Sequence, residues 1–103
     1  MAWYAYLAYF FAGFFLANGV PHFVHGISGK RFPSPFASPP AKGESPPLVN
    51  VLWGLANLLI AYTLIFKVGD FHFGFTRDAL MVVLGALVAA IFLSLYFERV
   101  RNR

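Results

Sequence analysis

The stretch ALMVVLGALVAAIFLSLYF, residues 79–97, contains no charged side chain. A helix needs about 20 predominantly apolar residues to cross the hydrocarbon core of a bilayer, so this stretch predicts a membrane-spanning helix. Two other apolar runs have a similar length: residues 2–20, without a formal charge, and residues 48–68, with only Lys67 near their end. The sequence therefore predicts an all-α membrane protein with three transmembrane helices.

The composition of the chain supports this fold class. Of its 103 residues, 59% are hydrophobic and 12% are charged, whereas soluble chains have about 45–50% apolar and about 25% charged residues. A small soluble domain has too little interior to bury that much apolar surface. There is no cysteine, which excludes disulfides, thiolate metal ligands and thiol nucleophiles. We interpret the first run as a mature helix, because it lacks a basic leader and Pro21-His22-Phe23 is a poor cleavage sequence.

The length of 103 residues predicts a single membrane domain. Helix 1 is expected to end at Asn18-Gly19-Val20-Pro21, since Asn or Gly takes the left-handed C-cap conformation and proline cannot continue the helix. The predicted layout is helix 1 at about 2–20, a proline-rich loop at 21–47, helix 2 at about 48–68, a short outer loop at 69–78, helix 3 at about 79–98 and a basic tail at 99–103.

The basic residues predict the orientation of the three spans. The proline-rich loop and the C-terminal tail lie on one side and carry Lys30, Arg31, Lys42, Arg99, Arg101 and Arg103. The other side carries only Lys67 and Arg77 besides the N-terminal amine. The positive-inside rule therefore places the loop and the C-terminus in the cytoplasm and the N-terminus outside. The basic side chains favour contact with anionic lipid headgroups, and too few of them are present to indicate nucleic-acid binding.

Small residues in the third span predict a packing face. Gly85 and Ala89 are four residues apart and lie on one side of the helix. Small residues at this spacing let two membrane helices approach closely. The face is expected to contact another helix of the same chain or of another chain.

Amides in the second span predict a second contact. Asn50, Gly54 and Asn57 share one stripe of the helix, with Asn57 near the middle of the bilayer. A buried amide needs a hydrogen-bond partner there, and Tyr9, Tyr62 and Ser94 are the candidates. Asn18 is also expected to contact another helix or a partner. The spans contain no carboxylate and no basic group at depth, which argues against a proton-coupled transporter.

His22 and His25 are three residues apart and form a candidate metal or haem site. Two ligands are fewer than the three or four that zinc takes, and two histidines on one turn cannot bind haem iron from both sides. The orientation places His72 on the opposite side of the membrane. A closed site would therefore need Glu44, a second copy of the chain or a cofactor, and the absence of any cofactor is the preferred interpretation.

The proline-rich loop is too long for a simple link between adjacent antiparallel helices. It is also more apolar than a flexible tether. We expect an ordered cap over the cytoplasmic helix ends. The residues expected to form it are Pro21, Phe23, Phe32, Pro33, Pro35 and Phe36.

The string NGVPHFVHGISGKRFPSPF, residues 18–36, is followed by PLVNVLWG at residues 47–54. It resembles a pattern, NGxPHFxHGxxGxxFPxPF, that recurs in a group of small uncharacterised bacterial inner-membrane proteins. The resemblance covers about a third of the chain and implies a bacterial inner-membrane location. It implies no activity.

No catalytic sequence motif is present, which favours a protein without enzymatic activity. The leading hypothesis is a protein that works by association, as an accessory subunit of a larger membrane complex or as a homo-oligomer. The alternative is a metal or haem redox protein that uses His22 and His25. A second alternative is an oligomeric channel or small transporter lined by the Asn50–Asn57 stripe.

Overall fold

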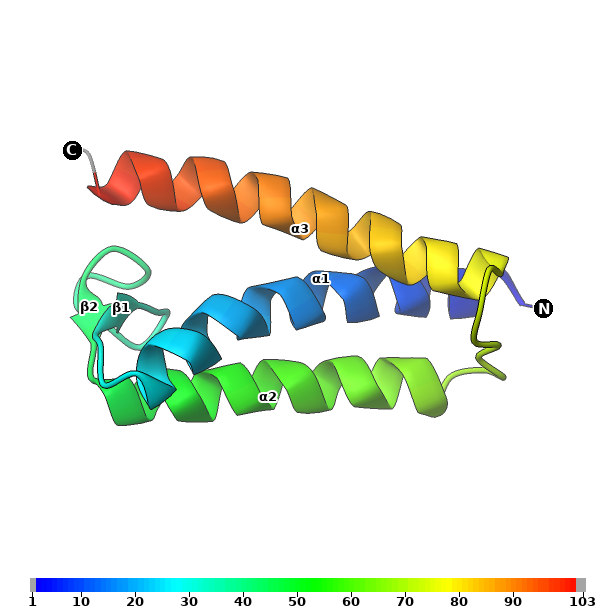
Figure 1. Cartoon of the computed structure of the whole chain (residues 1–103), viewed down its shortest axis with the longest axis horizontal. Helices are drawn as coiled ribbons and strands as arrows, with labels where there is room; N and C mark the ends of the chain where they lie inside the picture. Colours follow the sequence, from blue (N-terminus) through cyan, green and yellow to red (C-terminus); the bar gives the residue numbers. More distant parts are fainter. Residues whose placement is uncertain (1, 102–103) are drawn as a thin grey trace.

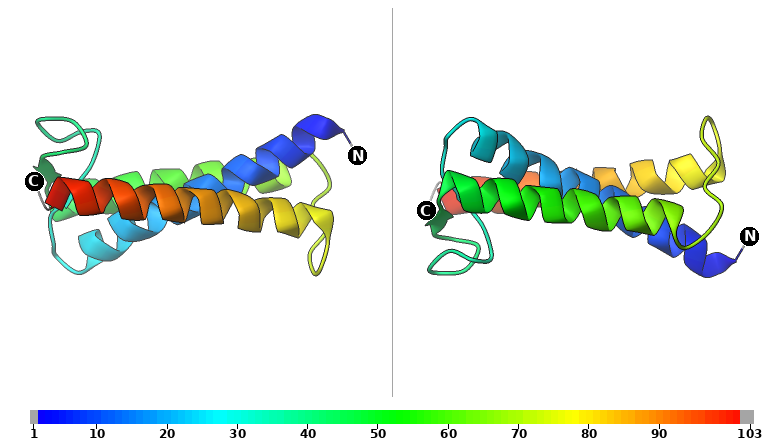
Figure 2. Two further views of the ribbon diagram at one scale, coloured as in Figure 1. Left: turned by 90° about the horizontal axis from the view of Figure 1, so that it is seen from above. Right: turned by 90° about the horizontal axis from the view of Figure 1, so that it is seen from below.

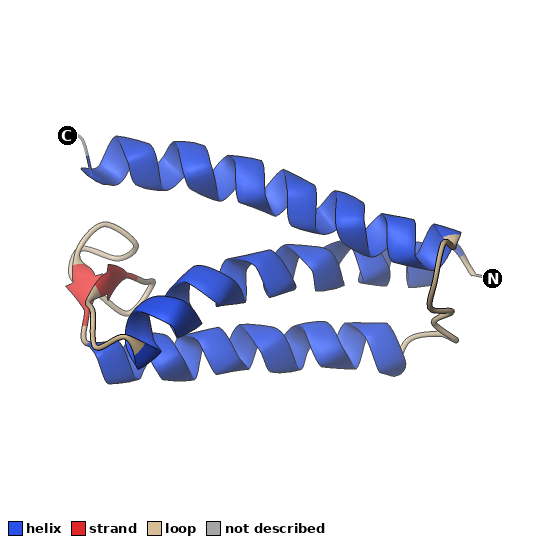
Figure 3. Cartoon of the chain, in the orientation of Figure 1, coloured by secondary structure: helices blue, strands red, loops and turns tan. Residues whose placement is uncertain are grey.

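The computed structural model describes residues 2–101. Within them the chain forms three helices, α1 (Trp3–Ile27), α2 (Pro47–Phe66) and α3 (Arg77–Arg101). Two short strands, β1 (Phe32–Pro33) and β2 (Glu44–Ser45), pair antiparallel between α1 and α2 (Figure 3). All three helices are long and apolar enough to cross a membrane. The predicted all-α class with three potential spans is therefore confirmed.

Helix α1 lies between the other two helices (Figure 1). It packs on both α2 and α3, which hardly touch each other. Seen from above and below, α1 crosses its neighbours obliquely (Figure 2). The longest dimension of the molecule is 43 Å, close to the thickness of about 40–45 Å of a bilayer with its headgroup regions.

The first helix does not end at Pro21, and the predicted boundary near residue 20 is wrong. Helix α1 continues through this proline to Ile27. Gly29, two residues beyond the end of the helix, has a φ of 72° and therefore lies in the left-handed region. The N–H of Lys30 donates to the carbonyl of His25 at 2.8 Å, and the N–H of Gly29 donates to that of Gly26 at 3.1 Å.

This hydrogen-bond pattern is a Schellman motif. A glycine cap does end the helix, but at a later glycine than the sequence indicates. Proline interrupts a membrane helix only locally when neighbouring helices pack around it, because it removes a single backbone donor. Gly19, the glycine expected to cap the helix, is instead buried against α2.

The other boundaries shift by smaller amounts. Helix α2 begins at Pro47, where a missing N–H costs nothing, and ends at Phe66 rather than near residue 68. Helix α3 continues to Arg101, so part of the predicted basic tail is helical. Arg103 lies outside the described residues.

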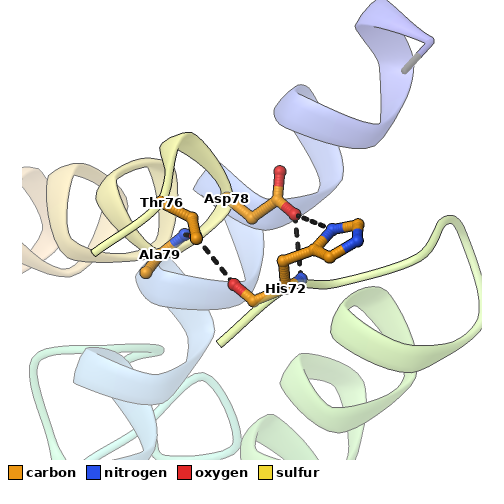
Figure 4. Close-up of polar contacts among 4 residues, drawn as sticks. All are labelled: His72, Thr76, Asp78 and Ala79. Atoms are coloured by element: carbon orange, nitrogen blue, oxygen red, sulfur yellow. Dashed lines mark hydrogen bonds and ion pairs between the residues drawn. The ribbon is translucent and has the colours of Figure 1, made fainter. Parts of the chain in front are cut away.

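The start of α3 is capped by side chains from the preceding connection (Figure 4). Thr76 Oγ1 accepts a hydrogen bond from the N–H of Ala79 at 3.1 Å and donates to the carbonyl of His72 at 2.7 Å. The carboxylate of Asp78 accepts from the backbone N–H of His72 at 2.9 Å, and it lies 3.2 Å from His72 Nδ1. These contacts fix the connection of residues 67–76 on the first turn of α3.

Glycines let α1 approach both of its neighbours closely. A Cβ atom at Gly13 would overlap the carbonyl oxygen of Val82, and one at Gly85 would overlap that of Phe10. A Cβ atom at Gly54 would lie 2.7 Å from the backbone nitrogen of Phe23. Both interfaces therefore depend on backbone-to-backbone proximity, as is common where membrane helices associate.

Candidate functional site

Residues 28–46, which we call the cap, fold over one end of the helix bundle. We call this end, which also carries the last turn of α3, the cap end (Figure 1). The side chain of Asn50 lies beneath the cap and is fully buried. Its Nδ2 donates to the carbonyl oxygens of Phe32 at 3.1 Å, Ser45 at 3.1 Å and Pro46 at 3.2 Å. One amide therefore joins both strands of the cap to α2.

The same amide fixes the tautomer of His22. Because carbonyl oxygens only accept, the amide nitrogen of Asn50 must face them and its Oδ1 must face the histidine ring. His22 Nδ1 lies 2.9 Å from that oxygen and donates to it. In the neutral ring, Nε2 then carries a lone pair and can only accept a hydrogen bond. His22 is 3% exposed.

Further side chains hold the cap from its other faces. The hydroxyls of Ser34 and Ser45 are buried and bond to each other. Tyr96 Oη, on α3, donates to the carbonyl of Ala41 at 2.8 Å. The guanidinium of Arg101 lies 5.8 Å from the ring centroid of Phe32, within cation–π range. All three helices thus contribute to the position of the cap.

A cavity of about 270 Å³ opens between α1, α3 and the cap. Its walls are mostly apolar and aromatic. The lining residues are Asn18, His22, Pro33, Ser34, Pro35, Ala41, Trp53, Phe92, Leu93, Tyr96 and Phe97. The cavity therefore combines aromatic and apolar walls from α2 and α3 with polar groups from α1 and the cap.

The two histidines of the predicted metal site make hydrogen bonds to different partners. His22 bonds to Asn50, whereas His25 Nδ1 donates to the carbonyl of Pro21 at 2.7 Å. The ring of His25 stacks on Phe32, with centroids 4.1 Å apart. Among residues 2–101, no three His, Asp or Glu side chains lie together in a group that could hold a metal ion. His72 belongs to the connection between α2 and α3, which lies at the end of the bundle opposite to the cap (Figure 1).

The predicted contact residues lie at the interfaces of α1. Asn50, Gly54 and Asn57 are buried on α2. Gly85 and Ala89 are buried on α3, and Gly85 meets the backbone of Phe10 on α1. These contacts lie within one chain.

The partners expected for Asn57 are wrong. Its Oδ1 accepts from Asn18 Nδ2 at 2.9 Å, and its Nδ2 donates to the carbonyl of Trp53 at 2.8 Å. Within residues 2–101, none of the expected partners, Tyr9, Tyr62 and Ser94, makes a hydrogen bond to it. The amide of Asn18 faces that of Asn57 across the interface of α1 and α2, an arrangement that depends on how the two helices cross.

The residues expected to form the cap divide into three groups. Pro21 and Phe23 belong to α1, because that helix is longer than predicted. Phe32 and Pro33 are buried in β1. Pro35 and Phe36 are exposed, with Phe36 at 67%.

Sequence reasoning missed the residues that hold the cap. The sequence does not predict that Ser34, Ser45 and Tyr96 hold the cap, and it predicts Asn50 as a helix contact or as part of a channel lining. The only available signal was the position of Asn50, one turn inside a helix that follows a proline-rich segment.

No family model, curated protein or solved structure matches the chain. The functional argument therefore rests on the described residues. Their buried polar groups hold the fold together: Asn50 and Ser45 hold the cap, and Asn57 joins two helices.

Proposed function

We propose that the chain is a small integral protein of the bacterial inner membrane that works by association. It acts as an accessory subunit of a larger membrane complex or as a homo-oligomer, without catalysis and without a cofactor. The resemblance of residues 18–36 to small bacterial membrane proteins supports the cellular location.

In this proposal the cap and the end of α3 face the cytoplasm and the N-terminus faces outside. The distribution of charge supports this orientation. The basic residues of the cap end are Lys30, Arg31, Lys42, Arg99 and Arg101. The opposite end has only Lys67 and Arg77 among the described residues, and the positive-inside rule orients spans by this difference.

The observation that carries the proposal is the fixed conformation of the cap. Two adjacent antiparallel helices need a connection of only a few residues, yet residues 28–46 are longer and are held by buried hydrogen bonds to Asn50. Ordering a chain segment costs conformational entropy, about 1–2 kcal/mol for each backbone residue. A segment ordered at that cost is better suited to present a surface than to link two helices.

The outer side of the cap has the composition of a contact surface. Phe36 is exposed beside Trp53, with ring centroids 5.3 Å apart, and Lys42 is exposed nearby in the sequence. Aromatic residues are enriched in protein interfaces, and the basic residues of the cap end favour a partner of opposite charge. The partner is expected to present an apolar and acidic surface at the cytoplasmic edge of the membrane.

Purification from native membranes in mild detergent tests the proposal. We expect the wild-type chain to elute as an oligomer or with a membrane-protein partner. The variant Phe36→Ser should reduce the associated fraction at least fivefold, as expected for the loss of an interfacial aromatic anchor. A monomeric wild-type chain without a co-purifying partner would contradict the proposal.

Phe75→Ser is the matched control. Phe75 is also an exposed phenylalanine in a connection, but it lies at the opposite end of the bundle. Its replacement should leave the associated fraction unchanged. Equal losses in the two variants would indicate a general effect of surface hydrophobicity and would argue against the cap as the contact surface.

A further inference from the structure

The cavity between α1, α3 and the cap contains two hydrogen-bond acceptors from α1 that have no partner among the described residues. Two side chains of α1, Asn18 and His22, lie four residues apart on the same face and line it. Each has one atom committed to a hydrogen bond within the fold and one atom without a partner among residues 2–101. The uncommitted atoms decide which ligands the cavity can bind.

The orientation of Asn18 follows from a backbone carbonyl. Asn57 Nδ2 donates to the carbonyl of Trp53, so Asn57 Oδ1 is the atom that faces α1. Asn18 must therefore present its Nδ2 to Asn57, as observed at 2.9 Å. Its Oδ1 remains available as an acceptor.

The same reasoning applied to Asn50 leaves Nε2 of His22 as a second acceptor. Among residues 2–101, the only side-chain nitrogen or oxygen atoms both fully buried and unpaired are Tyr9 Oη and Trp53 Nε1. His22 Nε2 and Asn18 Oδ1 are thus unpaired but not sealed off. An accessible pair of acceptors in an apolar cavity calls for a hydrogen-bond donor on the ligand.

The charge around the cavity indicates which kind of hydrogen-bond donor a ligand can carry. The cap end carries the basic residues given above, against Glu44 and Glu98 as its acidic ones. This excess of positive charge disfavours an ammonium group. An anion would bring its negative charge against two uncommitted acceptors, His22 Nε2 and Asn18 Oδ1, and on α1 it could use only the second N–H of Asn18 Nδ2 as a donor. A neutral hydroxyl group satisfies both conditions.

The size and walls of the cavity indicate a ring. An apolar cavity of about 150 Å³ holds benzene, so a cavity of about 270 Å³ has room for one substituted ring. Trp53, Tyr96 and Phe97 supply aromatic walls, which pack well on a flat ligand. We propose that this cavity binds a neutral hydroxylated aromatic ring, a phenol or quinol, in which each hydroxyl donates one hydrogen bond, the first to His22 Nε2 and a second hydroxyl, where the ring has one, to Asn18 Oδ1.

A pair of ring compounds tests the proposal on the wild-type chain in lipid nanodiscs. Trimethylhydroquinone has two hydroxyl donors, and its dimethyl ether has the same ring without a donor. Calorimetry should show that the quinol binds at least tenfold more tightly, because the ether leaves both acceptors unpaired. Equal affinities of the quinol and the ether would overturn the proposal.

The ¹⁵N resonance of His22 Nε2 provides a direct readout. It should shift when the quinol binds, because the nitrogen then accepts a hydrogen bond, whereas the resonances of His25 and His72 should not. The variant Leu93→Trp, which fills the cavity without removing a polar group, should abolish both binding and the shift. An unmoved His22 resonance would overturn the proposal even if Leu93→Trp fails to fold.

The source of the ring is distinguished by a quinol with an isoprenoid tail. If it binds more tightly than the quinol without a tail, the natural ligand is dissolved in the membrane. If the tail adds nothing, the ligand is a soluble phenol. Both results support a hydroxylated ring, and neither depends on the proposed association.

Discussion

Helix α1 packs against α2 and α3 by different means. Glycines bring backbones close in both interfaces, with Gly54 on α2 and Gly85 on α3. Only the interface with α2 adds side-chain hydrogen bonds, from Asn18 to Asn57 and from His22 to Asn50. No side-chain hydrogen bond joins α1 to α3 within residues 2–101. Glycines therefore allow the helices to approach closely, whereas the side-chain hydrogen bonds determine the register of one helix against the other.

The difference follows from the physics of helix association in lipid. Close packing of small residues supplies attraction at many registers, since sliding by one turn brings other small residues into contact. A buried amide pair matches at only one register, because any slip leaves a polar group unsatisfied. Helix α2 is thus fixed in position relative to α1, and α3 is held by shape and by the contact of Tyr96 with the cap.

The largest effect is expected when a methyl group is added to the α1–α3 interface. In Gly85→Ala the new Cβ must displace the backbone of Phe10, so the two helices have to separate. We expect the free energy of unfolding to fall by about 3 kcal/mol, at the upper end of the range for overpacking. Unfolding in mixed micelles with increasing SDS, followed by circular dichroism, measures it.

Ala90→Val is the control for this variant. Ala90 is exposed on the same helix, so the extra methyl groups meet lipid or detergent. The free energy of unfolding should change by less than about 0.5 kcal/mol. Similar losses in the two variants would mean that the close approach of Gly85 does not hold α3 in place.

A smaller effect is expected from the removal of the buried amide beneath the cap. Asn50→Leu leaves the carbonyls of Phe32 and Ser45 and the Nδ1–H of His22 without their partner. We expect a loss of about 2 kcal/mol in the free energy of unfolding, within the range of about 1–3 kcal/mol for one buried group left unpaired, because the cap can open so that its carbonyls bond to water.

Hydrogen exchange should locate this effect in the cap. The amides of Ala41 and Gly43, which bond within the cap, should lose protection in Asn50→Leu, while those in the middle of α1 keep it. Thr63→Val is the control, since its hydroxyl bonds only to the carbonyl of Leu59 on the exposed face of α2. Unchanged protection of the cap amides would show that Asn50 does not hold the cap.

The helices could be predicted because their signal is local. Length and apolar composition alone indicate three spans, and the spacing of Asn50, Gly54 and Asn57 places them on one face. The end of α1 could not be predicted in the same way. Whether Pro21 stops a helix depends on what packs around it, and the sequence offers three glycines that can cap the helix, Gly19, Gly26 and Gly29.

The contacts of the cap were beyond prediction for a different reason. Tyr96 and Ala41 are 55 residues apart and meet only once α3 has packed on α1. The partner of Asn57 likewise depends on the crossing of α1 and α2, which sets whether Asn18, Tyr9 or Ser94 faces it. Composition shows that a buried amide needs a partner, and three-dimensional packing decides which residue provides it.

The smallest effect is expected for the hydrogen bond between Asn18 and Asn57, and it tests whether the α1–α2 interface alone contains such a bond. A double-mutant cycle with Asn18→Ala and Asn57→Ala should give a coupling energy of about 0.6 kcal/mol, the average for side-chain hydrogen bonds in membrane proteins, and at most about 1.7 kcal/mol. Asn57→Ala alone should cost more than Asn18→Ala, because the side chain of Asn57 is fully buried and also donates to the carbonyl of Trp53. A second cycle that pairs Asn57→Ala with Ser94→Ala should show no coupling, since Ser94 is exposed on α3. Coupling of Asn57 to Ser94 rather than to Asn18 would mean that α3, and not α2 alone, is fixed by a polar contact.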